Sequence, residues 1–385
     1  SSITESYITQ YKRTNKKRDR YEFNEKTEAV GSGVYGFSVL VKINGLDVFI
    51  ATDRETGQRV AIKKHKQKDQ DEFGVVFNAA ELVLAHDTYP CECQILQSMN
   101  HPNIIHVTDF FMTNCLGLMN LSLVVSDSRK DFPDLYMVMG TYPKEHETLF
   151  PNENCEFDLF HLIHRKKVKF NQEEIKCIMF QVFNGLKYLH ERKVLHRDIK
   201  GFEFFPLVID ANILITKSGQ VKICDFGLAR FYLKDDGNTP YSGDKITLNY
   251  RPPEVLLSET YYTSKIDIWS AGVVFVNMIM HAYISMEDLR ERYLTGSLLF
   301  VVRVGKSAGL IVAKGDDLHY LRTLPGFNTY FSDNKISSKI FTGDSKPRRI
   351  KTVFRDASKE LVDVLDRIFQ YNPSNRISAE EVLRM

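Results

Sequence analysis

The chain of 385 residues is longer than one hydrophobic core usually supports, which predicts two lobes or domains. Its 51 Lys and Arg residues nearly balance 49 Asp and Glu residues, which argues against a protein that coats nucleic acid or binds membranes broadly. The six cysteines form no Cys-x-x-Cys pair and lack a histidine at zinc-finger spacing. We therefore expect a reduced intracellular compartment, nuclear and/or cytoplasmic, with no metal-binding cysteine cluster and no disulfide framework.

Residues 1–20 are polar and lack periodicity, so they predict a disordered, basic tail. The basic cluster from Lys12 to Arg18 has two open interpretations, a nuclear address and a plain solvated segment. The apolar runs at 272–280 and 298–304 are too short or too interrupted by charge to cross a bilayer, and the N-terminus carries no apolar signal core. We expect neither a membrane nor a direct nucleic-acid partner.

The predicted fold begins at Tyr21, and a glycine-rich turn follows between two predicted strands. Missing Cβ atoms would let backbone amides of this turn approach phosphate oxygens, although many turns carry two or three glycines. A third apolar strand, Val60-Ala61-Ile62-Lys63, follows the turn and ends on a lysine. This lysine strengthens the interpretation of the turn as a phosphate-binding turn. The turn itself consists of Gly31, Ser32, Gly33, Val34, Tyr35 and Gly36.

Residues 89–99 predict an amphipathic helix, because Ile95, Leu96 and Met99 fall three, four and seven residues after Glu92. This spacing makes one helical face apolar and lets Glu92 turn toward Lys63. A surface glutamate is the ordinary interpretation of such a position. The Asn-His-Pro-Asn loop that follows the helix favours the ion pair with Lys63 instead.

The lobe boundary is predicted between a strand at 134–139 and a helix that starts within 155–159, capped by Asp158 or its neighbours. We expect an N-terminal lobe over 21–153 and a C-terminal lobe over 154–385. The clearest helix runs from Asn171 to His190, with a capping box at its start. Its apolar stripe predicts core packing. Two further helices are predicted, one that opens at 266–272 and one over 357–371.

Four short strings between Val194 and Glu254 carry the chemistry. They are Val194-Leu195-His196-Arg197-Asp198-Ile199-Lys200, Asn212-Ile213-Leu214-Ile215, Asp225-Phe226-Gly227 and Tyr250-Arg251-Pro252-Pro253-Glu254. Transfer of a γ-phosphoryl group requires a carboxylate that orients the attacking hydroxyl, oxygen ligands for Mg²⁺, and cations against the phosphates. The chain supplies these groups as Asp198, Asn212, Asp225 and Lys200. Together, and in this order, the strings rarely coincide by chance.

With these motifs the chain resembles the eukaryotic protein kinases, and more narrowly the transcription-associated branch of the cyclin-dependent kinases. The narrower resemblance rests on the strings at 100–105, 155–159, 241–254 and 262–270. It covers most of 21–280 and resumes at 355–383, where it supplies an arginine, Arg376, to pair with Glu254. It implies an α+β fold of two lobes, a mostly β N-lobe with one key helix and a mainly α C-lobe, with ATP between them.

The resemblance also implies an ATP- and Mg²⁺-dependent serine/threonine kinase, activated by a cyclin that packs on the helix around Glu92. In this family Asp198 would accept the proton of the substrate hydroxyl, Lys200 would meet the γ-phosphate, and Asn212 and Asp225 would hold Mg²⁺. For Asp158 a place near the ribose and a plain helix cap are equally good interpretations. The ATP-binding residues so implied are the glycine-rich turn, Ala61, Lys63, Glu92, Met139, Cys155, Asp158 and Leu214.

Substrate choice is implied less directly. The family accepts proline after the target Ser or Thr, because proline lacks the amide hydrogen for which the activation segment offers no acceptor. We expect Ser/Thr-Pro substrates among proteins of transcription or the cell cycle, such as Ser-Pro repeats in an RNA polymerase tail. Lys245 and Asn249 depart from the family pattern in this segment.

Regulation by phosphorylation is a second departure. The position of the family's activating phosphate is Ser242, five residues before Thr247. The phosphate clasp implied by the resemblance retains Arg197 and Arg230, but its third position is Cys91 in place of an arginine. The sequence therefore predicts a weakened clasp.

Six interruptions of the family pattern are predicted, near 37–47, 72–87, 116–130, 140–152, 201–209 and 281–293. The interruption at 201–209 separates Lys200 from Asn212, although both belong to one phosphate and metal cluster. Real surface excursions and wrongly translated non-coding sequence are both open explanations. A rival interpretation is a catalytically silent, kinase-like interaction module, because an insertion inside the catalytic loop would displace Asn212 and misplaced catalytic groups lose rate steeply.

Overall fold

The computed structural model describes residues 19–22, 41–43, 46–57, 59–65, 95–96, 98–113, 134–140, 157–201, 211–216, 218–232, 246–283, 315–331 and 357–385. The chain divides into two compact units. The first comprises Ser1–Asn100 and Ile105–Cys155, and the second comprises His101–Ile104 and Glu156–Met385. The predicted lobe boundary, between residues 153 and 154, lies two residues before this division.

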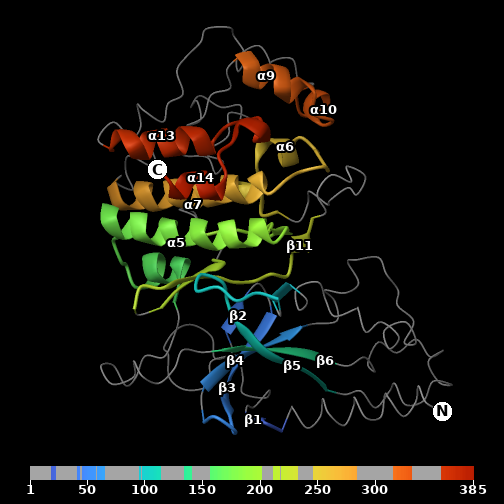
Figure 1. The fold of residues 1–385 in the computed structure, drawn as a ribbon, viewed down its shortest axis with the longest axis vertical. Coiled ribbons are helices and arrows are strands. Elements are labelled where there is room, and N and C mark those ends of the chain that lie inside the picture. Colours follow the sequence, from blue (N-terminus) through green and yellow to red (C-terminus); the bar gives the residue numbers. More distant parts are fainter. Residues whose placement is uncertain are drawn as a thin grey trace, which may run out of the picture. The chain divides into compact units, whose positions relative to one another are not determined.

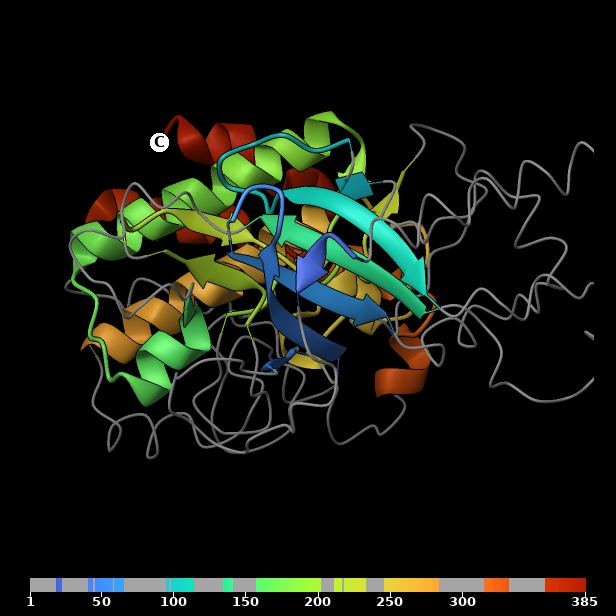
Figure 2. The same ribbon diagram turned by 90° about the horizontal axis from the view of Figure 1, so that it is seen from below.

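The first unit contains one antiparallel sheet in the order β1-β3-β4-β6-β5, with β2 paired to β3 beside this path (Figures 1 and 2). The predicted strands at 60–63 and 134–139 are confirmed as parts of β4 and β6. The strands are β1 Tyr21–Glu22, β2 Val41–Ile43, β3 Leu46–Asp53, β4 Arg59–His65, β5 Val107–Thr113 and β6 Asp134–Gly140.

Strands β2 and β3 are paired, and this pair begins inside the first predicted interruption, residues 37–47, and ends beyond it. Ile43 lies opposite Leu46, so two residues, Asn44 and Gly45, connect the strands. Asn-Gly is the dipeptide that two-residue hairpin turns prefer, because both positions need a positive φ. This part of the interruption therefore adds strand residues to the sheet. The Asn-Gly pair was the sequence feature from which a strand pair could have been predicted here.

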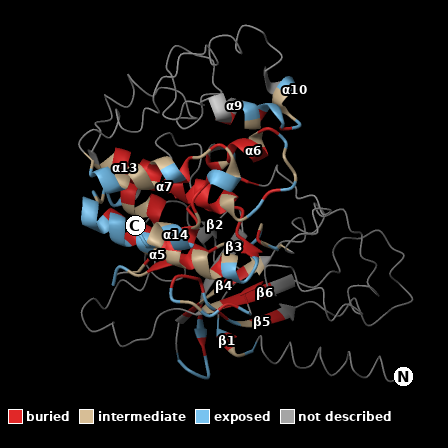
Figure 3. Ribbon diagram, turned by 45° about the horizontal axis from the view of Figure 1, so that its top comes forward, coloured by how far each residue is buried: buried red, intermediate tan, exposed pale blue. Residues whose placement is uncertain are grey.

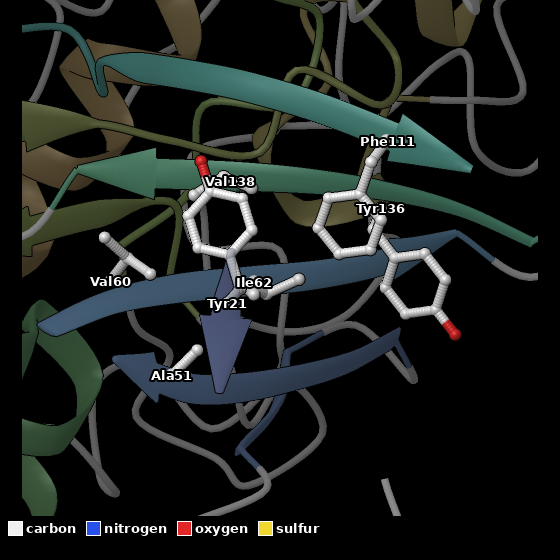
Figure 4. Packing of buried hydrophobic residues seen from close by; sticks show 7 residues of the cluster. All are labelled: Tyr21, Ala51, Val60, Ile62, Phe111, Tyr136 and Val138. Carbon is white, nitrogen blue, oxygen red and sulfur yellow. The ribbon is translucent and has the colours of Figure 1, made fainter. Parts of the chain in front are cut away.

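One face of the sheet carries an apolar core, drawn in Figure 4. Its strand residues alternate along each strand, because successive side chains point to opposite faces. The Phe111 ring stacks between two others, with centroid distances of 5.7 Å to Tyr21 and 4.9 Å to Tyr136. The cluster comprises Tyr21, Ala51, Val60, Ile62, Phe111, Tyr136 and Val138.

The N-terminal edge of the sheet is fastened by Arg20, the last residue of the predicted disordered tail. Its guanidinium binds Asp53 through two hydrogen bonds, Nε to Oδ1 at 2.8 Å and Nη2 to Oδ2 at 2.7 Å. The Arg20 hydrogen bond, with smaller help from Thr56, holds the pKa of Asp53 well below its usual value. The described structure therefore includes Asp19 and Arg20, ahead of the predicted start at Tyr21.

The second unit is built on helices α5 Gln172–Glu191 and α7 Lys265–Tyr283, which pack together (Figure 1). Helix α13 Lys359–Ile368 packs on α7, and α14 Ala379–Leu383 packs on α5. The remaining helices are short: α6 Pro253–Leu256, α9 Gly315–Arg322, α10 Phe327–Phe331, the π-helix η3 His161–Arg165, and the 3₁₀ helices η5 Leu248–Tyr250 and η6 Pro373–Asn375.

The predicted helix at 171–190 is confirmed as α5, together with its capping box. The Asn171 side chain accepts the Glu174 amide at 3.0 Å, and the Glu174 carboxylate accepts the Asn171 amide at 2.8 Å. The predicted apolar stripe is buried. Gly185 permits a close approach, since a Cβ there would lie 2.9 Å from the Ile223 side chain and 3.1 Å from the Asn103 carbonyl.

The helix predicted to open at 266–272 is confirmed as α7, which is buried all round. Every residue from Ile266 to Met280 is buried, and Figure 3 shows α7 buried along most of its length while α5 also carries exposed residues. A Cβ at Gly272 would overlap the side chains of Ile368 and Phe369, so the glycine sets the close contact with α13. Such a helix belongs to the centre of a core.

Short strands complete the second unit. One small sheet has the order β10-β9-β7, formed by β10 Val221–Ile223, β9 Ile213–Ile215 and β7 Phe157–Asp158. The other pairs β8 Val194–Leu195 with β11 Arg230–Phe231. These strands hold the ends of the loops that carry Asp198, Asn212 and Asp225.

The helix predicted to start within 155–159 begins at Leu159. Residues 157–158, just before it, form β7, because they pair with Ile215 and Leu214. Asp158 does cap that turn, since its Oδ1 accepts the His161 amide at 2.6 Å. The predicted helix at 357–371 is shorter, Lys359–Ile368, because the Gln370 carbonyl is turned to Arg376. No helix among the described residues combines the length and apolarity needed to cross a bilayer.

Candidate active site

The predicted catalytic residues Asp198 and Lys200 lie on a loop that follows strand β8 in the second unit. His196 fastens this loop to the segment that carries Asp225. Its Nε2 lies 3.0 Å from the Cys224 carbonyl oxygen, and its ring meets the Phe226 ring edge to face at a centroid distance of 4.8 Å. Two of the four predicted strings are therefore joined through a buried imidazole.

Three side chains surround the Asp198 carboxylate. Asn212 Nδ2 donates to both the Asp198 backbone oxygen and Oδ2, each at 2.8 Å. Thr247 Oγ1 donates to Oδ1 at 2.6 Å, and Lys200 Nζ lies 3.2 Å from Oδ2. The structure thus brings together Asp198, Lys200 and Asn212, which the sequence predicted to share one site. Thr247, which sequence reasoning used only as a landmark, is an additional contact.

Burial raises the pKa of Asp198 above its ordinary value, and the charge of Asp225 raises it further. The Lys200 ammonium and the Thr247 hydroxyl oppose this shift, but they do not cancel it. A carboxylate with a raised pKa is a stronger base than a solvent-exposed aspartate. The hydrogen bonds fix its orientation, so the group can accept a proton from a hydroxyl held beside it.

Asn212 and Asp225 flank one hairpin, where Asn212 precedes β9 and Asp225 lies two residues beyond β10. The Cys224 amide donates to the Asn212 carbonyl at 3.0 Å, which holds the two positions together. The side-chain Oδ1 of Asn212 is buried and has no hydrogen-bond partner among the described residues. A buried amide oxygen beside a carboxylate is the donor set that Mg²⁺ prefers, so these residues fit the ion.

The interruption at 201–209 does not separate Lys200 from Asn212 in space. The Asn212 amide donates to the Lys200 carbonyl at 3.0 Å, across the whole interruption. If residues 201–209 were absent, this bond would join the first and fourth residues of a β-turn. Gly201 is also anchored, since a Cβ there would lie 2.9 Å from the Val274 side chain. Lys200 and Asn212 therefore keep the spacing that a shorter loop would give them.

Asp267, on the first turn of α7, is the buried anchor of the catalytic loop. Its Oδ1 accepts the Arg197 amide at 2.9 Å, and its Oδ2 accepts the His196 amide at 3.0 Å and lies 3.0 Å from His190 Nε2. Burial opposes ionisation, but the hydrogen bonds and charge of His190 and His196 together hold the pKa of Asp267 below its ordinary value. Sequence reasoning missed this role. The signal was a lone carboxylate in an otherwise apolar helix, which must find partners when buried.

The segment after Thr247 is held by a buried ion pair. Arg376 Nη1 and Nη2 donate to the two carboxylate oxygens of Glu254 at 2.8 and 3.0 Å, which confirms the predicted pairing. The Arg376 guanidinium also lies over the Trp269 ring, 4.9 Å from its centroid. Before this pair, Arg251 Nε donates to the Ile246 carbonyl at 2.8 Å. The backbone next to Thr247 is thus tied at both ends.

The structure describes only Arg197 and Arg230 of the predicted phosphate clasp. Arg197 is buried, and its Nε donates to the Leu228 carbonyl at 2.6 Å. Arg230 lies half-buried on β11, opposite Leu195. Ser242 and Cys91 lie outside the described residues. The clasp therefore stays a prediction.

Three of the predicted ATP-binding residues are described in the first unit. Ala61 and Lys63 lie on β4 and Met139 on β6, and Ala61 is directly opposite Met139 in the ladder. Lys63 is buried, while Ala61 and Met139 are half-buried. In the second unit, Leu214 is half-buried on β9, and Asp158 makes the cap described above, so its place near a ribose stays a prediction. The glycine-rich turn, Glu92 and Cys155 lie outside the described residues.

Comparison with known proteins identifies the class to which this site belongs. The family model described as Protein kinase domain matches residues 25–385, so the chain belongs to the protein kinase domain family. Within that family it is similar to cyclin-dependent kinases. It is 27% identical over 363 residues to cyclin-dependent kinase 9 of Xenopus tropicalis, with 93% of this chain and 78% of that protein covered. It is 30% identical over 366 residues to cyclin-dependent kinase 12 of Drosophila melanogaster, with 94% of this chain and 25% of that protein covered.

A solved structure supports the fold. A chain of the yeast RNA Pol II CTD kinase CTDK-1 complex matches with a TM-score of 0.57 and 23% identity, over 93% of this chain and 94% of that one. The comparisons confirm the predicted protein kinase fold and the predicted similarity to cyclin-dependent kinases of the transcriptional branch.

Proposed function

We propose that the chain is an active serine/threonine protein kinase that uses ATP and Mg²⁺. The observation that carries the proposal is the contact of Asp198 with Asn212 and Thr247 across the interruption, because a displaced Asn212 would be expected of a silent module. In a phosphoryl transfer the protein mainly positions groups and stabilises charge. The described residues of the second unit supply both.

Each group has a proposed role. Asp198 orients the hydroxyl of the substrate and accepts its proton, and Thr247 and Asn212 fix the carboxylate for this step. Lys200 carries its ammonium beside Asp198 and offsets charge on the transferred γ-phosphoryl group. Asn212 and Asp225 would hold Mg²⁺, which neutralises charge on the nucleotide phosphates when bound. The family motif, rather than a contact in the structure, assigns Lys63 to the α- and β-phosphates, with Glu92 as its partner.

The test of this assignment is the Asp225→Ala variant. We expect it to abolish transfer of the γ-phosphoryl group to a peptide while the protein melts at its normal temperature. The wild-type chain and Phe180→Ala, a variant at an exposed position on α5, serve as controls. Activity retained in Asp225→Ala would overturn the Mg²⁺ assignment.

We further propose that the kinase is proline-directed. The supporting contact is the hydrogen bond from Arg251 Nε to the Ile246 carbonyl at 2.8 Å. Ile246 immediately precedes Thr247, whose side chain contacts Asp198. Because Arg251 already donates to this carbonyl, the backbone amide of the residue after the target Ser or Thr would find no acceptor there. Proline has no amide hydrogen, so it loses no hydrogen bond at this position.

A peptide array checks the proposed preference. We expect Ser-Pro peptides to be phosphorylated faster than Ser-Ala peptides of the same flanking sequence. In the Arg251→Leu variant the Ile246 carbonyl becomes available to accept a hydrogen bond from a substrate amide. The ratio of the Ser-Pro rate to the Ser-Ala rate should therefore fall. Equal rates for the two peptides in the wild-type protein would refute proline direction, and with it Ser-Pro repeats of an RNA polymerase tail as the substrate.

The remaining proposals come from the relatives. Their names describe cyclin-dependent enzymes, which supports a cyclin partner. A nuclear or cytoplasmic place of action stays a prediction. The proposed docking element is the helix predicted around Glu92, a residue outside the described part of the chain. The chain purified alone should be nearly inactive, and the same chain purified from eukaryotic cells together with its bound proteins should be active. Full activity of the chain alone would show that cyclin dependence is wrong.

A further inference from the structure

Basic side chains gather between the π-helix η3 and the start of α5 in the second unit. Three lysines are exposed there, within four consecutive positions of the chain. His164 on η3 precedes them, and its ring meets the ring of His281 on α7 edge to face, with centroids 6.4 Å apart. We call this group the basic patch, and it comprises His164, Lys166, Lys167, Lys169 and His281.

The members of the basic patch are close enough in space to act on one another. Burial lowers the pKa of His281 below its usual value, and the neighbouring His164, Lys169 and Lys167 lower it further. Each of these neighbours is basic, although they come from η3 and from the segment after it. Positive charge from separate parts of the chain therefore converges on one surface.

The carboxylates nearest in the sequence leave the basic patch positive. Glu173 and Glu174 lie on the first turn of α5, and the Asn171 amide donates to Glu174 Oε2 at 2.8 Å. In the described part of the chain, neither Lys167 nor Lys169 forms an ion pair. A partner of opposite charge can thus reach ammonium groups that the chain itself does not neutralise.

Lys167 occupies a backbone position at which glycine is the usual residue. Its φ of 56° lies in the left-handed region. This residue follows the end of η3, where the Lys166 amide donates to the His161 carbonyl at 3.0 Å. The Val168 amide donates to the Leu162 carbonyl, also at 3.0 Å. Helices commonly end on one left-handed residue, and glycine suits it because glycine has no Cβ. The lysine thus adds charge to the patch at a position where its side chain is conformationally unfavourable.

Helices α5 and α7 set the distance from the basic patch to the catalytic loop. The patch lies at the start of α5, whereas the last turn of α5 carries His190, which contacts Asp267 at the start of α7. Helix α7 ends at the patch, where it carries His281. At 1.5 Å per residue these helices separate the patch from Asp267 by roughly 20–30 Å. An extended peptide needs at least about six to nine residues to span that distance.

The size and composition of the basic patch fit an acidic protein segment. Nucleic-acid binders commonly neutralise about six to ten phosphates, and polybasic membrane anchors use about four to eight basic residues. The patch offers three lysines, and none of the large apolar side chains exposed in the described part of the chain belongs to it. A substrate protein carries its acidic segment on the same chain as its target hydroxyl. Weak charge contacts then gain from a high effective concentration.

We propose that the basic patch is a docking site for an acidic segment of the substrate protein. The segment is rich in Asp and Glu and lies at least about six to nine residues from the target Ser or Thr. This proposal rests on the proposed kinase function of the same unit. Docking away from the reacting atoms stabilises the bound substrate and the transition state equally. It therefore lowers the KM for the substrate and leaves the maximal rate unchanged.

The first experiment measures binding without catalysis. The probe is a fluorescent peptide rich in Glu and Gly, without Ser, Thr or Tyr, and its anisotropy is titrated with the full-length chain. The variants are Lys167→Gly, Lys169→Ala and their combination, and Lys359→Ala on the first turn of α13 is the control because Lys359 is also exposed. Lys167→Gly removes a charge but supplies the residue that the backbone favours, so its melting temperature should not fall.

We expect the combined variant to weaken binding of the acidic peptide roughly three- to thirtyfold, the range that two or three exposed ion pairs provide. Each single variant should weaken it less, and Lys359→Ala should bind as wild type does. Binding by the wild-type chain should disappear near 1 M salt, where charges are screened within about 3 Å. The variant Lys169→Arg keeps the charge and should retain the affinity.

The second experiment measures transfer to Ser-Pro peptides by the full-length chain purified from eukaryotic cells with its bound proteins. The peptides carry the Glu-rich segment either about three or about ten residues from the target serine, or lack it. We expect the long spacing to lower the KM roughly three- to thirtyfold relative to the uncharged peptide, at an unchanged maximal rate. The short spacing cannot reach the patch and should give no gain, and the combined variant should show no gain at either spacing.

Two results would overturn the proposal: equal binding of the acidic peptide by wild type and the combined variant, or a gain in KM that does not depend on spacing. A single-stranded RNA of equal charge, or phosphatidylserine vesicles, that binds more tightly than the peptide through the same lysines would also overturn it. The binding experiment separates this proposal from the proposed function. If the wild-type chain transfers no phosphate, the kinase proposal fails, while peptide binding that depends on Lys167 and Lys169 would still support an acidic docking partner.

Discussion

The two units fix their functional side chains by different means. In the first unit, Lys63 lies in the middle of strand β4, and its place is set by the ladder, opposite Val48 on β3 and Met137 on β6. In the second unit, Asp198 lies on a loop, and its place is set by side chains that reach it from elsewhere in the chain. A strand position needs only a correct register. A loop position needs buried polar anchors, and these converge on Asp267.

The largest effect is expected from removal of that anchor. Asp267→Ala leaves the amides of His196 and Arg197 and the ring of His190 without their acceptor. We expect a loss of about 3–5 kcal/mol of stability, the range seen when one partner of a buried pair is removed. The transfer rate should fall at least about a hundredfold. Denaturant unfolding and peptide phosphorylation measure the two effects.

The same variant predicts a pH dependence with a definite sign. The pKa of Asp267 is lowered in the folded protein, so the folded state binds fewer protons at this group than the unfolded state near the unfolded pKa, about 3.9. Its contribution to stability is thus present above that pH and is lost as the pH falls through the lower folded pKa. The difference in stability between wild type and Asp267→Ala should shrink as the pH falls below about 4. A difference that grows toward acid would contradict the assignment.

A substitution in the first unit should show that the sheet and the catalytic loop are stabilised independently. Phe111→Ala removes the ring that stacks between Tyr21 and Tyr136, and we expect a loss of about 3–5 kcal/mol. Hydrogen exchange should increase along β3 to β6 and stay unchanged at residues 196–200. Phe180→Ala, an exposed phenylalanine on α5, is the control and should change stability by less than about 0.5 kcal/mol. Faster exchange at 196–200 in Phe111→Ala would show that the loop depends on the sheet after all.

A smaller effect is expected at the start of α5. Asn171→Ala removes the cap and half of the capping box, which costs about 1 kcal/mol. Because the cap lies at the far end of α5 from His190, the transfer rate should hardly change. Thermal unfolding at fixed pH measures the loss, and a loss above about 2 kcal/mol would mean that Asn171 has a further role.

The smallest effect is expected from the deletion of residues 201–209. The hydrogen bond between the Asn212 amide and the Lys200 carbonyl already closes the loop, so the shorter loop should form the same turn. We expect transfer within about twofold of wild type, and stability within about 1 kcal/mol because loop length enters only logarithmically. A variant without activity would show that the interruption contributes to the site.

The comparison between the units also explains what could be predicted from the sequence. Strand β4 and helix α5 with its capping box could be predicted, and so could the proximity of Asp198, Lys200 and Asn212, because each depends on periodicity or on a short motif. The contacts of Thr247 and Asp267 could not be predicted, because each joins positions some 50 to 70 residues apart in the chain. Strand β7 was missed because its two residues become a strand only when β9 offers a partner.

The central claim is that the chain keeps an assembled catalytic centre in spite of the interruption between Lys200 and Asn212. The most direct measurement is the stability of the full-length chain with and without Mg·ATP. With the nucleotide at about 100 times its Kd, an intact site gains about 2.7 kcal/mol. We expect this gain in the wild-type protein and its loss in Asp225→Asn. A wild-type chain whose unfolding is unaffected by Mg·ATP would contradict the claim and would mark it as a silent, kinase-like module.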